Sequence, residues 1–417
     1  MSLLKVSRSK ILFLMLLIAF AAQQFSIPLD ITPIRPYMVL VIFYALFVFV
    51  SVVQRGSFSL NINPIDFSLL LLYSYIFCTI VYADDTAIAL HLMGGLCVLI
   101  ISYFIVKIYS LSLSLADFRQ VLVVAAKIFF IGSFAWYLIG CIAYYFFNVS
   151  LDLVSDEAAF SSLYGVYVEG GIMPRFRGIC DSPNNFGMYS VIFFPILFFY
   201  EEKPPIYLYI IFVFSVIATI STTTYFAFML IFFIMSVISI SKFNFKKISA
   251  RFFKVSMCLF FIVLIICYFV INLSLVDSLN GIIDSRVART ETGSGRWELW
   301  EYTLELIKER PIFGYGLNQS RDLLLPLRAL KSTHNNFLEL LIEGGAVALF
   351  LYISLLITSI YCVFRSTKRG SDRNWMFYAL IGTFVFSNAN VNVYNDSFIL
   401  LLALISVVYG YFKRKII

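Results

Sequence analysis

Long apolar runs, most of them without a charged residue, limit what this chain can fold into. Hydrophobic residues make up 61% of its 417 residues and charged residues only 13%, whereas a soluble domain carries roughly a quarter charged residues. The apolar residues do not follow the spacing of a half-buried helix or strand, and a helix needs about 20 of them to cross a bilayer. The sequence therefore predicts an all-α polytopic membrane protein.

Twelve segments are predicted to span the membrane, so that residues 1–417 form a single integral membrane domain. They lie at about 11–29, 37–53, 66–82, 87–106, 120–146, 186–200, 205–220, 223–241, 255–275, 343–364, 375–390 and 396–412. Only Ser221 and Thr222 separate two of these segments. That pair is expected to be either a tight hairpin or a broken element.

The basic residues orient the chain. With the N-terminus in the cytoplasm, the cytoplasmic connections hold most lysines and arginines, among them Lys107 and the C-terminal Lys413-Arg414-Lys415. The short connections on the other side carry little beyond Arg35, Asp84 and Asp85. Both termini are therefore expected in the cytoplasm. The net charge of +7 is explained by this topology and gives no support for nucleic-acid binding.

Cysteine placement argues against a disulfide framework or a zinc site. Six of the seven cysteines fall inside predicted spans at no metal-like spacing, and Cys180 alone lies in a loop. The outer loops also contain no Asp-x-Asp-like pattern that would hold a metal ion. No metal or other cofactor is expected.

Two outer loops, 147–185 and 276–342, are too long to be simple connectors, and function on a membrane scaffold is often placed in such loops. In the larger loop, Trp297, Trp300, Leu304 and Ile307 recur at helical spacing, which predicts an amphipathic helix lying on the membrane surface. Arg296 opens this helix directly after Gly293-Ser294-Gly295. It is a candidate bidentate phosphate donor, and the alternative is an arginine that snorkels to lipid phosphate.

His334 is one of only two histidines in the chain, and it lies among polar residues. It is predicted to open a second short helix, on which Asn335, Glu339 and Glu343 form a polar stripe, before Gly344-Gly345 permits a bend into the next span. A helix N-terminus disfavours the protonated imidazole, so His334 is expected to be neutral at pH 7 and able to accept a proton. The alternative is a histidine that only caps or packs.

The smaller loop ends in a second candidate anion site. Arg175 and Arg177 flank an aromatic residue, and Asn184 follows at the entry to a span. An asparagine-rich entry is poor membrane sequence unless it lines a polar cavity. These three residues are therefore expected to contact a diphosphate, with a pair of interfacial anchors as the alternative reading.

Several motifs together resemble one family. Gly295-Arg296-x-x-x-Trp300, the segment Pro311-Ile312-Phe313-Gly314-Tyr315-Gly316, and His334-Asn335 followed by Glu343-Gly344-Gly345 are similar to the O-antigen ligase and polymerase superfamily. These are bacterial inner-membrane proteins that move glycans from undecaprenyl diphosphate. Residues 174–187 resemble the other arginine-bearing outer loop of this family, so the resemblance covers about 174–225 and 293–348.

The resemblance implies a glycosyltransferase C-like fold in the bacterial inner membrane, with its active site at the periplasmic face. It implies an undecaprenyl-diphosphate-linked oligosaccharide as donor, membrane lipids as surroundings, and a chain-length regulator and a flippase as partners. The family's catalytic arginine and histidine fall on Arg296 and His334, with Glu339 or Glu343 as orienting carboxylates. Arg289 and Asn335 are further candidate substrate contacts.

Two departures from the ligase pattern favour a repeat-unit polymerase. Ligases carry an arginine after a Thr/Ser pair at the start of a span, where this chain has Thr223 and Thr224, and Gly345-Ala346-Val347-Ala348 lacks the ligase Gly-x-x-Gly. The first alternative is a ligase that transfers the glycan to lipid A-core in lipopolysaccharide biosynthesis. A transporter of lipid-linked oligosaccharide fits less well, because no internal repeat is evident and the charged candidates gather on one face.

Overall fold

The computed structural model describes residues 2–27, 33–55, 61–147, 149, 152–155, 160–169, 173–201, 204–241, 296–325, 332–367 and 374–414. The predicted span 255–275, the glycines before Arg296 and the candidate Arg289 lie outside the described residues.

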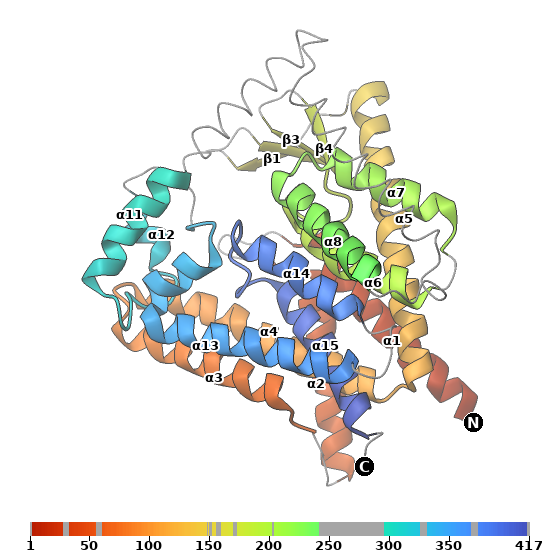
Figure 1. Ribbon diagram of the computed structural model, residues 1–417, viewed down its shortest axis with the longest axis horizontal. Coiled ribbons are helices and arrows are strands. Elements are labelled where there is room, and N and C mark those ends of the chain that lie inside the picture. Colours follow the sequence, from red (N-terminus) through yellow and green to blue (C-terminus); the bar gives the residue numbers. More distant parts are fainter. Residues whose placement is uncertain are drawn as a thin grey trace.

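Most of the described chain is helical (Figure 1). The longer helices are α1 (Ser2–Ala21), α2 (Pro36–Arg55), α3 (Pro64–Cys78), α4 (Thr86–Leu111), α5 (Leu115–Phe147), α6 (Pro183–Tyr200), α7 (Ile206–Ala218), α8 (Thr222–Ser241), α11 (Arg296–Glu309), α13 (Asn336–Thr367), α14 (Trp375–Ser387) and α15 (Asp396–Arg414), and α12 (Ser320–Leu323) is one short turn.

Apart from 255–275, every predicted span overlaps one of these helices. Six described segments are long and apolar enough to cross a membrane, namely Pro36–Gln54, Pro64–Tyr82, Thr86–Leu111, Leu115–Phe147, Asn336–Ser366 and Asp396–Lys413. The fold is thus that of a helical membrane protein, and the number of twelve spans stays a prediction.

The helix boundaries follow local chemistry. Asn63 caps α3 by accepting from the backbone N–H groups of Ile65 and Asp66, and the Asp66 carboxylate accepts from the Asn63 N–H in return. Ser182 caps α6 by accepting from the backbone N–H of Asn185, with Pro183 in the first helical position. Between α7 and α8, Ile220 adopts a positive φ of 46°, so the pair is two separate helices joined by a tight turn.

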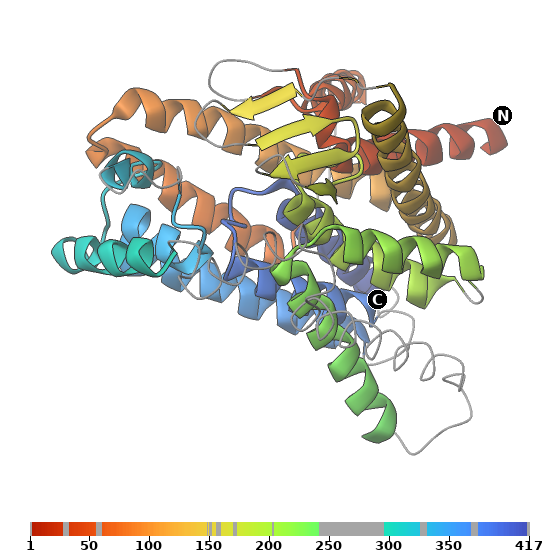
Figure 2. The same cartoon turned by 90° about the horizontal axis from the view of Figure 1, so that it is seen from above.

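A small sheet in the 147–185 loop corrects the all-α prediction. The strands β1 (Asp152–Ser155), β2 (Phe160–Leu163), β3 (Val166–Glu169) and β4 (Met173–Phe176) form an antiparallel meander in that order. Val166, Val168 and Phe176 are buried, and Figure 2 shows the sheet beside α5. Strands of four residues are too short to give a clear alternating signal, so their pairing decides the structure here.

The helices pack around α15, whose residues are almost all buried. It contacts α4 and α13, while α14 packs on α6 and α8, and α3 packs on α13. One basic residue was placed wrongly from the sequence. Lys107 lies inside α4, only 1% exposed, and pairs with the buried Asp66, rather than in a connection. A buried cation must be paired, and Asp66 provides that partner.

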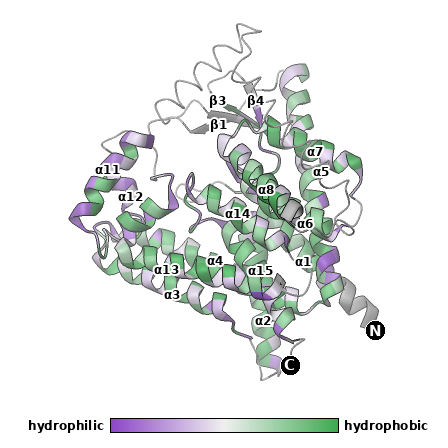
Figure 3. Ribbon diagram, viewed as in Figure 1, coloured by the Kyte–Doolittle hydropathy of each residue, from purple (hydrophilic) through white to green (hydrophobic). Residues whose placement is uncertain are grey.

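The helices have two opposite ends, which differ in the polar contacts found near them. Lys10 pairs with Asp117 and Lys127 with Glu201 near the end that carries both termini. The sheet, α11 and α12 lie away from the termini in Figure 1. This second end is made by the described parts of the connections after α1, α3, α5, α7 and α14 together with residues 296–325 and 332–344. It is called the outer end below, after the side predicted for these segments. Figure 3 shows hydrophilic colour on α11 and apolar colour along most of the packed helices.

Candidate functional site

His334 directly precedes a capped helix at the outer end. The Asn335 Oδ1 accepts from the backbone N–H groups of Phe337 (2.9 Å) and Leu338 (3.2 Å), which makes Asn335 the N-cap of α13. The expected bend is confirmed, because α13 is interrupted at Gly345, where φ is 63° and ψ is −165°. A short helix after His334 and a long apolar one after Gly345 are therefore parts of one kinked element.

His334 itself has a φ of 51°, a left-handed backbone conformation that is uncommon outside glycine. The preceding residue fixes this turn. The Thr333 N–H and Oγ1 both donate to the Glu339 Oε2, at 2.8 and 2.7 Å. Strained backbone of this kind persists only where its surroundings hold it, and it is common at functional sites.

Helix α11 brings Arg296 to His334. The Trp300 Nε1 donates to the Thr333 carbonyl at 2.9 Å, and the buried Leu299 and Thr303 form the face of α11 nearest the protein core. Burial, and then the positive charge of Arg296, lower the pKa of His334 to about 4. The pKa of Arg296 is also lowered by burial. The imidazole is thus neutral at pH 7, as expected, although burial and Arg296 replace the helix dipole as the cause.

Glu339 and Glu343 form a buried pair one turn apart. The Ser320 hydroxyl lies 2.7 Å from the Glu339 Oε1 and 2.9 Å from the Glu343 Oε1. The Tyr394 hydroxyl donates to the Glu343 Oε2. Of the predicted polar stripe, Glu339 and Glu343 face the protein interior, whereas Asn335 is the N-cap and lines the groove described below. Glu339 reaches the His334 turn through its two hydrogen bonds with Thr333.

An apolar groove opens beside this site. Its volume is about 500 Å³, and its lining is Trp297, Trp300, Glu301, Leu304, Asn335, Phe337 and Leu338. Trp297 is 63% exposed and Leu304 48% exposed. Trp297 and Leu304 of α11 thus line the groove and lie at the protein surface, and the location of this helix at a membrane surface stays a prediction.

The smaller-loop candidates are built into the fold. Arg175 is 9% exposed, and its Nε and Nη2 donate to the carbonyls of Thr219 (2.9 Å) and Ile220 (3.3 Å) in the α7–α8 turn. The Asn184 Oδ1 accepts from the Ser221 hydroxyl in the same turn. These contacts favour a place in an internal polar region over interfacial anchoring.

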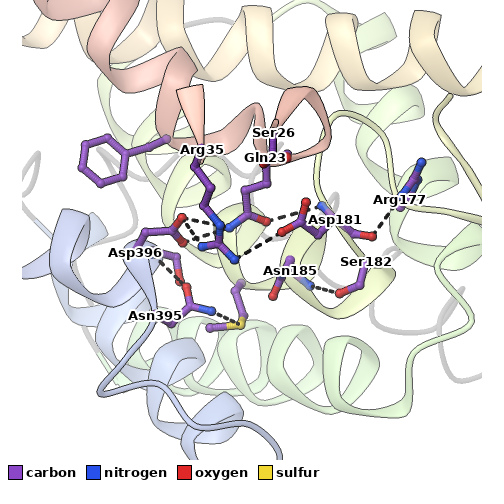
Figure 4. Close-up of polar contacts among 12 residues, drawn as sticks. Gln23, Ser26, Arg35, Arg177, Asp181, Ser182, Asn185, Asn395 and Asp396 are labelled. Atoms are coloured by element: carbon purple, nitrogen blue, oxygen red, sulfur yellow. Dashed lines mark hydrogen bonds and ion pairs between the residues drawn. The ribbon is translucent and has the colours of Figure 1, made fainter. Parts of the chain in front are cut away.

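Arg177 turns toward a different neighbour. It is 7% exposed, and its Nε and Nη1 donate to the carbonyls of Tyr164 (2.9 Å) and Asp181 (3.2 Å). Figure 4 shows it at the edge of a second charged cluster. The two arginines that alternate in the sequence therefore serve different parts of the outer end.

The second charged cluster was not recognised in the sequence. The Arg35 Nη1 contacts the Asp396 Oδ2 at 2.6 Å and the Arg35 Nη2 contacts the Asp181 Oδ2 at 3.2 Å (Figure 4). The Gln23 Nε2 adds contacts of 2.9 and 3.0 Å to both oxygens of Asp396. The sequence could have indicated this cluster, because Arg35, Asp181 and Asp396 all lie at the predicted outer ends of different spans and include both signs of charge.

Within the described ranges, no group of three or more His, Cys, Asp or Glu side chains could hold a metal ion.

Residues 207–353 match the family model described as O-antigen ligase. The match begins at α7 and ends inside α13, so it includes Arg296, His334 and the glutamate pair. It confirms the resemblance to the O-antigen ligase and polymerase superfamily. No curated protein matches the chain at a significant level.

Proposed function

We propose that this protein, whose residues 207–353 match the O-antigen ligase family, is a surface-polysaccharide polymerase. It joins undecaprenyl-diphosphate-linked oligosaccharide repeat units at the periplasmic face of the bacterial inner membrane. The observation that carries the proposal is a neutral His334 close to Arg296, with the neighbouring residues Asn335 and Trp297 lining an apolar groove. A lipid-linked diphosphate sugar needs these three elements, namely a base, a cation and an apolar surface.

In the proposed reaction, an acceptor hydroxyl attacks the anomeric carbon of the donor sugar. A bond forms between the acceptor oxygen and that carbon, and the bond from the carbon to the diphosphate oxygen breaks with its electron pair on the diphosphate. His334 takes the hydroxyl proton as general base. Arg296 stabilises the charge on the leaving diphosphate, so that no metal ion is required. A single in-line displacement inverts the anomeric configuration.

Arg296 also links donor binding to base strength. In the free protein, its positive charge helps to lower the pKa of His334 to about 4, where the imidazole is a weak base. A diphosphate bound at Arg296 offsets that charge, so the pKa of His334 rises toward its ordinary value. His334 is then a stronger base when the donor is bound, and in the free protein its low pKa limits unproductive uptake of a proton.

In the proposed polymerase, Arg175 replaces a diphosphate contact that the ligase pattern assigns to a span arginine. The arginine that ligases carry near the start of a span is replaced here by Thr223 and Thr224. The Arg175 guanidinium contacts the carbonyls of Thr219 and Ile220 at the turn just before those threonines. These contacts put a cation from a different part of the sequence beside Thr223 and Thr224, and we assign it the role of a second diphosphate contact.

The ligase reading remains the second candidate, because the matching family is described as O-antigen ligase. In that case the acceptor is lipid A-core instead of a second lipid-linked repeat. The same donor site and the same roles of Arg296 and His334 apply.

Purified protein should be incubated with lipid-linked repeat units, with and without lipid A-core. A ladder of polymer without lipid A-core supports the polymerase, and product formed only on lipid A-core shows the ligase. His334→Ala and Arg296→Ala should each lower the rate by about a hundredfold or more. Arg310→Ala, at the other end of α11, is the matched control. Absence of transfer by the folded wild-type protein to either acceptor would contradict the proposal.

A further inference from the structure

The charged cluster of Arg35, Asp181 and Asp396 lies outside the His334 site, yet a short segment joins the two. Asp396 is the first residue of α15 and its side chain is fully buried. Arg35 holds it at 2.6 Å, and Gln23 contacts both of its carboxylate oxygens. The start of α15 is therefore fixed to the connection that follows α1 (Figure 4).

The residues just before Asp396 are fixed to α13. The Val393 N–H donates to the Asn336 Oδ1 at 2.7 Å, and the Tyr394 hydroxyl donates to Glu343. Asn336 and Glu343 lie in the part of α13 between His334 and the kink at Gly345. Asn336 and Glu343, near the two ends of this segment of α13, are thus both held by the connection between α14 and α15.

This connection has little freedom to absorb a movement. Tyr394 and Asp396 are two residues apart, a span of at most about 7 Å. The Asn395 N–H donates to the Asn392 carbonyl at 2.8 Å, and the Asn395 Oδ1 accepts from the Ser397 N–H at 2.9 Å. A displacement of Asp396 is therefore passed on to Tyr394 and Val393.

From α13 the route reaches the catalytic turn. Glu343 shares the Ser320 hydroxyl with Glu339, and Glu339 holds Thr333 through two hydrogen bonds. Thr333 precedes His334, whose left-handed backbone depends on being held in place. Glu339, Glu343, Ser320 and Thr333 are buried, and buried polar groups are costly to leave unpaired.

We infer that Asp396, anchored by Arg35 and Gln23, is a positioning residue for His334 and acts through Tyr394 and Glu343. The rate measurement below rests on the proposed function, whereas the labelling measurement does not. Positioning matters because a misplacement of about 1 Å at a catalytic group can cost about a hundredfold in rate.

The first test measures the reactivity of His334. The chain has only two histidines, so reaction with diethyl pyrocarbonate can be followed at His334 and at the exposed His91 by mass spectrometry of peptides. Asp396→Asn and Tyr394→Phe should each raise the reaction rate at His334 several-fold and leave that at His91 unchanged. Tyr394→Phe removes only one hydroxyl, and it carries the test if Asp396→Asn fails to fold.

The matched control is Asp66→Asn. Asp66 is also a fully buried carboxylate in an ion pair with Lys107. Its contacts lie at the start of α3, in the last part of α4 and in the second half of α15, at the ends of these helices opposite the His334 turn. This variant removes a comparable interaction and should leave His334 reactivity at the wild-type value. An equal increase in Asp66→Asn would show general loosening of the fold and overturn the inference.

The second test uses transfer kinetics. Asp396→Asn should lower kcat by about a hundredfold with little change in the KM for the donor. The double variant Tyr394→Phe/Asp396→Asn should be no slower than the slower single variant, because both substitutions break one route. Unchanged kcat and His334 reactivity in Asp396→Asn, or additive losses in the double variant, would refute the positioning role. If the protein proves to have no transferase activity, the labelling result still decides the inference.

Discussion

The protonation of His334 provides the sharpest test of the site. Its pKa is lowered from 6.5 to about 4, with burial as the larger cause and the charge of Arg296 as the smaller. Replacing Arg296 by Gln removes the charge and leaves most of the burial. Since Arg296 accounts for less than half of the difference, the pKa of His334 should rise to no higher than about 5.

The direction of the pH effect follows from these values. The unfolded chain takes up the proton near pH 6.5, whereas the folded chain does so only near pH 4. The folded state therefore loses stability as the pH falls from 6.5 to 4, and the loss ends below pH 4. A pKa difference of one unit corresponds to about 1.4 kcal/mol in the free energy of unfolding, so His334 contributes at most about 3 kcal/mol to this loss. In Arg296→Gln the loss should be smaller.

Selective isotope labelling of histidine makes the measurement direct, because only two signals are expected and His91 serves as the reference. The His334 signal should titrate near pH 4 in the wild-type protein and at a higher pH in Arg296→Gln. Arg310→Gln is the control, since Arg310 lies about 20 Å away along α11 and should have no effect. A wild-type midpoint near 6.5, or no change in Arg296→Gln, would show that the described geometry of the turn is wrong.

Three further outcomes are expected. Gly345→Ala should lower the midpoint of thermal unfolding, because φ is 63° and the added Cβ would lie 2.1 Å from the Ile312 carbonyl oxygen. Gly94→Ala, in open space on α4, should leave the midpoint unchanged. Equal midpoints in the two variants would remove the argument for the kink. Asn335→Ala should destabilise the folded protein by about 1 kcal/mol through loss of the helix cap, while the KM for the donor stays unchanged. Asn335→Ser should retain most of the stability. A raised KM at normal stability would instead make Asn335 a substrate contact. In a cysteine-free background, Glu305→Cys should react with an impermeant thiol reagent added from the periplasmic side, and Lys413→Cys should not. The opposite pattern would reverse the predicted orientation.

The amphipathic helix and the bend were predictable because they depend on local sequence. Trp297, Trp300 and Leu304 recur at helical spacing, and α11 begins at Arg296 and ends just before Pro311 as that spacing indicates. Gly345 marks the kink, since only glycine adopts its backbone conformation without a steric penalty. The neutral state of His334 was also anticipated, but its cause required the position of Arg296.

What the sequence determined by itself is the class of protein and the position of its helices, because hydropathy and capping act over a few neighbouring residues. Tertiary structure decided which distant groups meet. Arg35 and Asp396 are 361 positions apart, and no periodic pattern connects them. The same holds for the pairing of the four short strands and for Arg175 at the α7–α8 turn. These contacts arise because buried charges and backbone groups must find partners, and only the packed fold determines which partners lie within reach.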